Sequence, residues 1–137
     1  MTWIVDTSVA VKWAVAEEGS DLAAPFFGGD VVAPDLLCSE LGNALWKKVK
    51  RNEIGALQAT AAFAEIEGML SFLPTDALAH RALDIALAID HPVYDCVYLA
   101  LSEATGMPIL TSDRRLIVNC RKTPFAERLV ALEQATP

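Results

Sequence analysis

The sequence predicts one α/β domain, residues 1–137, in which helices cover both faces of a central parallel sheet of four to five strands. Short apolar runs alternate with longer segments of helical periodicity, which is typical of a parallel sheet between two layers of helices. The runs are continuously apolar, as in strands that are buried on both faces. A length of 137 residues suits one core, and neither a linker nor an internal repeat divides it.

The first expected strand is the clearest, because three apolar residues, Trp3-Ile4-Val5, run without a polar break into Asp6. Prolines close the second and third strands, the fourth runs into Ser112, and the fifth is expected at an edge of the sheet. The expected strands are residues 3–8, 31–33, 71–73, 107–111 and 129–132.

Helices are indicated by apolar side chains that recur every three or four residues and by stop signals such as Gly19 and Gly106. In the third helix Leu37, Leu41 and Leu45 repeat every four residues, so this stripe faces the core. A polar stripe along the flank of the same helix consists of Glu40, Asn43, Lys47 and Arg51. The expected helices are residues 9–18, 20–27, 35–51, 52–70, 75–89, 93–106 and 114–118.

The composition limits the possible classes of protein. Hydrophobic residues make up 53% and the mean hydropathy is +0.34, which predicts that some apolar surface meets a partner. No apolar run has the length of a membrane span, and the amino terminus shows no secretory signal, so a cytoplasmic protein is expected. The net charge of −7 argues against a broad basic nucleic-acid surface and leaves room for a local one.

The cysteines and histidines favour neither disulfides nor zinc. Cys38, Cys96 and Cys120 are odd in number and lack the close spacing of a metal or redox motif, so they are expected to be reduced and mostly buried. His80 and His91 are isolated from each other and from any sulfur ligand. A metal in this protein is therefore expected to be held by oxygen.

Four carboxylates adjoin apolar strands or helix starts: Asp6, Glu40, Asp95 and Asp113. In an α/β unit the strand ends where the next helix begins, so all four are expected at one crevice. Each also has a structural interpretation. Asp6 would cap the next helix, and Asp113 would start a turn. Asp95 would stabilise the amino terminus of its helix through the helix dipole, and Glu40 would be a solvated residue on a helix face.

Carboxylates that converge repel one another, by about 1 to 4 kcal/mol for a pair 4 Å apart. A cation is needed to offset this repulsion, and oxygen ligands without His or Cys select Mg²⁺ or Mn²⁺. Such an ion suits the hydrolysis of phosphodiester bonds.

Four segments of the sequence form a series of motifs: IVDTS (residues 4–8), PDLLCSELGNAL (residues 34–45), YDCVYLALS (residues 94–102) and LTSDRRL (residues 110–116). In these motifs, their order and their spacing, the sequence resembles the PIN-domain ribonucleases and, within them, the VapC-like toxins of toxin–antitoxin pairs. The resemblance covers nearly the whole chain and weakens from Asn119 onward.

The resemblance implies a PIN-like three-layer α/β/α fold and a Mg²⁺- or Mn²⁺-dependent endoribonuclease. Asp6, Asp95 and Asp113 would hold metal directly or through water, and Glu40 would complete the site or orient the attacking water. It also implies RNA as substrate, a cognate antitoxin as inhibitor and a homodimer. The supporting residues would be Thr7, Ser8, Asn43 and Thr111, and the possible contacts to RNA phosphates are Lys47 and Arg51.

Other interpretations stay open. A module with the PIN fold that binds RNA or protein without cleaving is the main alternative. A phosphatase with Asp6 as nucleophile is disfavoured, because that chemistry usually needs a second Asp where Ser8 stands. A partner surface is expected near the helix aromatics Trp13, Phe26, Phe27 and Trp46.

Overall fold

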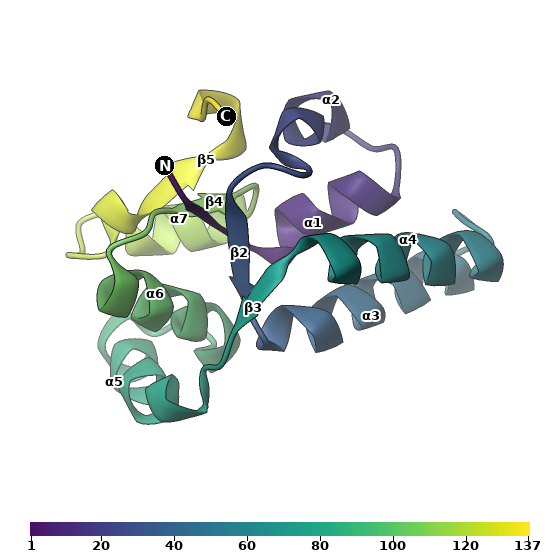
Figure 1. The fold of residues 1–137 in the computed structure, drawn as a ribbon. Helices are drawn as coiled ribbons and strands as arrows, with labels where there is room; N and C mark the ends of the chain where they lie inside the picture. Colours follow the sequence, from purple (N-terminus) through teal and green to yellow (C-terminus); the bar gives the residue numbers. More distant parts are fainter.

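The computed structural model describes all residues, Met1–Pro137, and contains a five-stranded parallel sheet with the order β3-β2-β1-β4-β5 (Figure 1). The predicted parallel sheet is confirmed, including its edge strand β5. The strands are β1 (Trp3–Val5), β2 (Val31–Pro34), β3 (Ser71–Leu73), β4 (Ile109–Thr111) and β5 (Leu129–Ala131).

The central strand β1 lies where the direction of the strand order reverses. From β1 the chain proceeds to β2 and β3 on one side and later returns to β4 on the other, so that Ile4 pairs with both Val32 and Ile109. Ligands of open α/β sheets bind outside the carboxyl ends of the strands at such a reversal. Asp6 follows β1 at this point, and Asp113 follows β4.

The helices agree with the prediction in number and differ at several ends. The first begins at Thr7 rather than at residue 9, because Asp6 caps it, and it ends four residues early at Ala14. The fourth begins at Ala56 rather than at residue 52, since Asn52 has a positive φ of 59°. The α-helices are α1 (Thr7–Ala14), α2 (Ser20–Ala23), α3 (Leu36–Lys50), α4 (Ala56–Met69), α5 (Ala79–Ile89), α6 (Val93–Thr105) and α7 (Arg114–Cys120). Short 3₁₀ turns cover Ala24–Phe26, Asp76–Leu78, Ala126–Arg128 and Leu132–Gln134.

Two hydrophobic cores lie on the two faces of the sheet, which confirms the three layers. Trp3 and Val5 point to one face and pack with residues of α1, α3 and α4, whereas Ile4 points to the other and packs with α5, α6 and α7. In Figure 1 α3 and α4 run beside each other on the first face, and α5 and α6 pack together on the second. None of the seven helices combines the length and apolar character that a membrane crossing requires.

The expectation that four helix aromatics lie near the surface is wrong for Phe26. Phe26 is 3% exposed and packs edge-to-face on Trp3. Trp13 packs edge-to-face on Phe27, and its indole N–H donates to the Ala23 carbonyl at 2.8 Å. Trp46, on α3, is 56% exposed, so it alone of the four presents most of its surface to solvent.

Candidate active site

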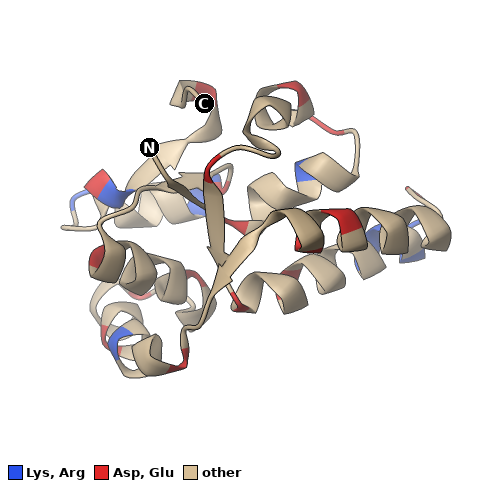
Figure 2. Cartoon of the chain, in the orientation of Figure 1, with Lys and Arg blue, Asp and Glu red and all other residues tan.

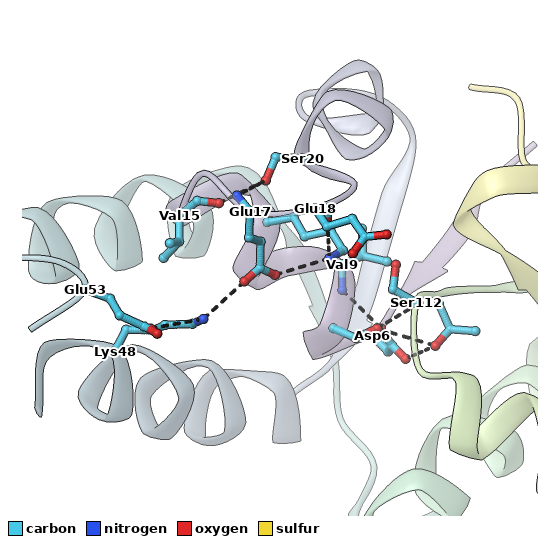
Figure 3. Close-up of polar contacts among 12 residues, drawn as sticks. Asp6, Val9, Val15, Glu17, Glu18, Ser20, Lys48, Glu53 and Ser112 are labelled. Atoms are coloured by element: carbon cyan, nitrogen blue, oxygen red, sulfur yellow. Dashed lines mark hydrogen bonds and ion pairs between the residues drawn. The ribbon is translucent and has the colours of Figure 1, made fainter. Parts of the chain in front are cut away.

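The Asp6 carboxylate lies at the carboxyl end of β1 and is bound only by neutral donors (Figure 3). Its Oδ1 accepts from the Ser8 hydroxyl at 2.5 Å and from the Val9 amide at 3.3 Å, and its Oδ2 accepts from the Thr111 hydroxyl. Asp6 is 7% exposed. Its negative charge is therefore buried without a cation beside it.

The electrostatics of Asp6 reflect this burial. Desolvation raises the pKa of Asp6 from 3.8 to about 7, even though the hydrogen bonds from Ser8 and Thr111 act in the opposite direction. The charge of Asp113 raises the pKa further. Asp6 and Asp113 thus form one electrostatically coupled pair of carboxylates.

Asp113 is held beside Asp6 by the residues that also bind the Asp6 side chain. The Asp113 amide donates to the Thr111 hydroxyl at 3.0 Å, and the Ser112 amide donates to the Ser8 hydroxyl at 2.8 Å. The Asp113 Oδ1 caps α7 by accepting from the Leu116 amide at 3.1 Å. Asp6 and Asp113 are therefore helix caps as well as members of the carboxylate pair, so neither interpretation excludes the other.

Glu40 forms a second group with Thr7 and Tyr98. Its Oε1 accepts from the Tyr98 hydroxyl at 2.7 Å and from the Thr7 hydroxyl at 3.0 Å. Burial raises the pKa of Glu40 against these two hydrogen bonds, and the charge of Asp95 adds to the increase. Burial raises the pKa of Tyr98, and the negative charges of Glu40 and Asp6 add to the increase.

Asp95 is the end of a chain of three hydrogen-bonded polar side chains, of which only His91 is buried. Its Oδ2 lies 2.5 Å from Nε2 of His91, and Nδ1 of His91 lies 2.9 Å from the Asn119 amide nitrogen. An amide nitrogen donates only, so Nδ1 accepts and Nε2 carries the proton toward Asp95. The His91 side chain is 1% exposed. These contacts of His91 with Asp95 and Asn119 were not predicted from the sequence.

Hydrogen bonds from the protein occupy one oxygen of each of three carboxylates and leave the other oxygen free. The free oxygens are Oε2 of Glu40, Oδ1 of Asp95 and Oδ2 of Asp113. Free carboxylate oxygens in a partly buried, acidic setting are suited to a hard cation.

The other predicted site residues are placed unequally. Thr7, Ser8 and Thr111 bind the carboxylates directly, as described above. Asn43 and Lys47 line a hollow of about 450 Å³ beside Glu40 and Thr7. Arg51 is exposed at the carboxyl end of α3 and does not line this hollow.

The donors fit Mg²⁺ or Mn²⁺ in chemical type. No three His, Cys, Asp or Glu side chains are gathered closely enough to hold a metal by themselves. Mg²⁺ usually takes one or two carboxylates from a protein and completes its shell with water and substrate phosphates. Either coupled pair, Asp6 with Asp113 or Glu40 with Asp95, supplies that number of ligands.

Comparison with known proteins places these residues in a family context. Residues 3–122 match the PIN domain. Ribonuclease VapC3 of Pyrobaculum aerophilum is 33% identical over 85% of this chain and 92% of its own, and Ribonuclease VapC1 of Mycobacterium tuberculosis is 38% identical over 61% and 63%. Exonuclease VapC9 of P. aerophilum is 28% identical over 66% and 68%. The crystal structure of PAE2754 from P. aerophilum superposes with a TM-score of 0.74 at 22% identity, covering 97% of this chain and 85% of that one.

Proposed function

Because the chain belongs to the PIN-domain family and is VapC-like, we propose that it is a Mg²⁺- or Mn²⁺-dependent endoribonuclease. The observation that carries the proposal is the Asp6 carboxylate, which is buried at the strand-order reversal among neutral donors with Asp113 beside it. A buried charge of this kind is costly for stability unless a cation or a proton compensates it. Its position outside the carboxyl end of β1, where ligands of open α/β sheets bind, supports a functional site there.

Metal binding and proton transfer in the proposed reaction are assigned to different residues of the chain. When bound, the metal would lower the pKa of a water molecule and stabilise charge on a phosphoryl oxygen. Asp6 and Asp113 would hold it directly, and Asp95 would hold it through water. Glu40, whose pKa is raised by burial, would orient the attacking water and take its proton on the free Oε2. Thr7 and Tyr98 bind Oε1 and so hold the Glu40 carboxylate in one orientation, with Oε2 free.

A cleavage assay separates the enzyme from the binding-only module. Asp6→Asn and Asp95→Asn keep the shape of the side chain and remove its charge, so RNA cleavage should fall to background while the proteins remain folded. The readout is mapping of new RNA ends with Mg²⁺, with Mn²⁺ and with chelator. Cleavage retained by both variants would refute the proposed site, and no cleavage by the parent would favour the binding module.

The relative named an exonuclease raises a second candidate, which differs in the kind of RNA end required. An endonuclease cuts a closed circular RNA, whereas an exonuclease needs a free end. We expect the parent protein to linearise a circular RNA in the presence of Mn²⁺. Degradation of the linear form of the same sequence, with the circle left intact, would assign the exonuclease instead.

The resemblance to VapC proteins also supports the role of a toxin held by an antitoxin, and a homodimer. An apolar groove of about 390 Å³ between α3 and α4, lined by Trp46 and Phe63, offers a surface for either contact. Light scattering of the purified protein tests the dimer, and co-purification with the product of an adjacent gene tests the antitoxin. A monomer that no such product binds would remove this part of the proposal.

A further inference from the structure

The hollow beside Glu40 carries three side chains that have no partner within the chain. Asn43 and Lys47 come from α3, and Tyr94 comes from the first turn of α6. None of the three forms a side-chain hydrogen bond or an ion pair, although Glu40 on the same wall forms two hydrogen bonds. With a volume of about 450 Å³, the hollow is in the range of small-molecule sites.

Tyr94 is an exposed aromatic ring next to an acidic site residue. It is 65% exposed, and Asp95 follows it on the same helical turn. Tyr98, one turn further along α6, is 2% exposed and is bound to Glu40, so the two tyrosines of the chain have opposite environments. A ring exposed beside a polar site is suited to stack on an unpaired base.

Lys47 is the one lysine in the last turns of α3 without a neighbour of its own. Lys48 pairs with Glu17 and Glu53, and the Lys50 ammonium lies 5.1 Å above the Trp46 ring. These lysines form the basic end of α3 that Figure 2 shows in blue. Lys47 follows Glu40 by seven residues, which is about 10 Å along the helix. It therefore reaches a phosphate next to the reacting one, not the reacting phosphate itself.

We propose that this hollow is a nucleotide subsite for single-stranded nucleic acid, in which one unpaired base stacks on Tyr94 and a flanking phosphate binds Lys47. The amide of Asn43 donates to the same nucleotide. This inference rests on the proposed nuclease function and adds the residues that hold an unpaired nucleotide beside the carboxylates. A duplex does not fit the subsite, because its bases are already stacked and paired and cannot turn onto the ring.

Binding in the presence of chelator tests the subsite apart from cleavage. The probe is a short, fluorescently labelled single strand with 2′-O-methyl sugars, and the readout is fluorescence anisotropy. Tyr94→Ala should weaken binding about 5- to 150-fold, the range that one stacked base contributes. Tyr94→Phe keeps the ring and should bind like the parent. For a duplex of the same sequence, Tyr94→Ala should change nothing.

The lysine is tested with a matched variant on the same helix. Lys47→Ala should weaken binding and reduce the slope of log affinity against log salt by about 0.7, the value for one phosphate on a single strand. Lys50→Ala removes the same charge and should leave affinity unchanged. Circular dichroism checks that each variant folds, which is expected because both lysines are exposed.

The outcomes distinguish the subsite from the proposed activity. If Tyr94→Ala binds as tightly as the parent, or if the parent does not bind the single strand, the subsite is refuted. Metal-dependent cleavage of RNA by the same parent protein would still support the nuclease. Conversely, binding that depends on Tyr94 without any cleavage would support the subsite and refute the nuclease.

Discussion

Two carboxylates near α1, Asp6 and Glu17, are held in opposite ways (Figure 3). Glu17 lies between the ammonium groups of Lys12 and Lys48, each at 3.2 Å. Asp6 is bound by two hydroxyls and an amide, with Asp113 adding negative charge beside it.

The difference separates a structural ion pair from a candidate site. Glu17 ties the segment after α1 to α3 through Lys48, whose pKa its hydrogen bond raises. Because all three groups are partly exposed, these pairs contribute little to stability. The charge of Asp6, by contrast, opposes folding in the absence of a cation.

The pH dependence of stability should show the largest difference. The pKa of Asp6 is about 7 in the folded protein and 3.8 as its ordinary value. Because the folded state binds the proton of Asp6 more tightly than the unfolded state does, protonation stabilises the fold. This stabilisation is complete below pH 3.8 and is lost as the pH rises to about 7. Relative to Asp6→Asn, the metal-free parent should lose about 4 kcal/mol across this window. Urea unfolding with chelator at several pH values measures it, and parallel pH profiles of the two proteins would contradict it.

Mn²⁺ should stabilise the parent protein more than the Asp113→Asn variant, in which the Asp6–Asp113 pair has lost one charge. Free Mn²⁺ at 100 times its dissociation constant should add about 2.7 kcal/mol. Asp113→Asn should blunt this increase and leave the metal-free protein as stable as the parent or more so, because Asn caps a helix as well as Asp does. Asp113→Ala removes the cap too and should cost about 0.5 to 2 kcal/mol at any metal concentration. Equal metal shifts of the melting temperature in the parent and in Asp113→Asn would make Asp113 purely structural.

His91 should act on metal affinity through Asp95. A side chain that orients a metal-binding carboxylate typically contributes 10- to 100-fold to affinity. His91→Ala should weaken Mn²⁺ binding by about this factor, and His91→Gln, which keeps a donor, should recover part of it. Titration followed by electron paramagnetic resonance measures the affinity. His80→Ala is the control, since the His80 side chain is 89% exposed and pairs only with Asp84. If His91→Ala and the control bind Mn²⁺ equally, Asp95 does not need His91.

Glu17→Gln should have the smallest effect. It removes the pairs with Lys12 and Lys48, and exposed pairs of this kind contribute about 0.2 to 1 kcal/mol. The loss should shrink in high salt, while RNA cleavage and the response to metal stay unchanged. Urea unfolding at low and high ionic strength measures the loss. If Mn²⁺ no longer stabilised the Glu17→Gln variant, Glu17 would take part in metal binding and would not be a purely structural ion-pair residue.

The predictability of the fold and of the site from sequence differed in kind. The strand Trp3–Val5 and the position of Asp6 after it follow from a local pattern, because an apolar run that ends in a carboxylate is visible in a few letters. The bond between Tyr98 and Glu40 joins residues 58 apart, and a buried hydroxyl has no periodicity that separates it from its apolar neighbours.

His91 was missed for a different reason. His91 and Asp95 are four residues apart, as in a helical pair, but α6 begins only after Pro92, so His91 lies outside the helix. The other hydrogen-bond partner of His91, Asn119, comes from α7, which is distant in the sequence. The ends of α1 and α4 were misplaced because Asp6 acts as a cap and Asn52 adopts a positive φ, and both depend on local geometry rather than on composition.

The double role of Asp6 and Asp113 as caps and as candidate metal ligands has a genetic consequence. Aspartate and asparagine codons differ by a single transition, and the amide keeps both helix starts in place. Loss-of-function alleles at these two positions are therefore expected to accumulate as full-length, folded protein rather than to be degraded. Such an inactive protein would keep the outer surface of the active protein and would still bind the same partners.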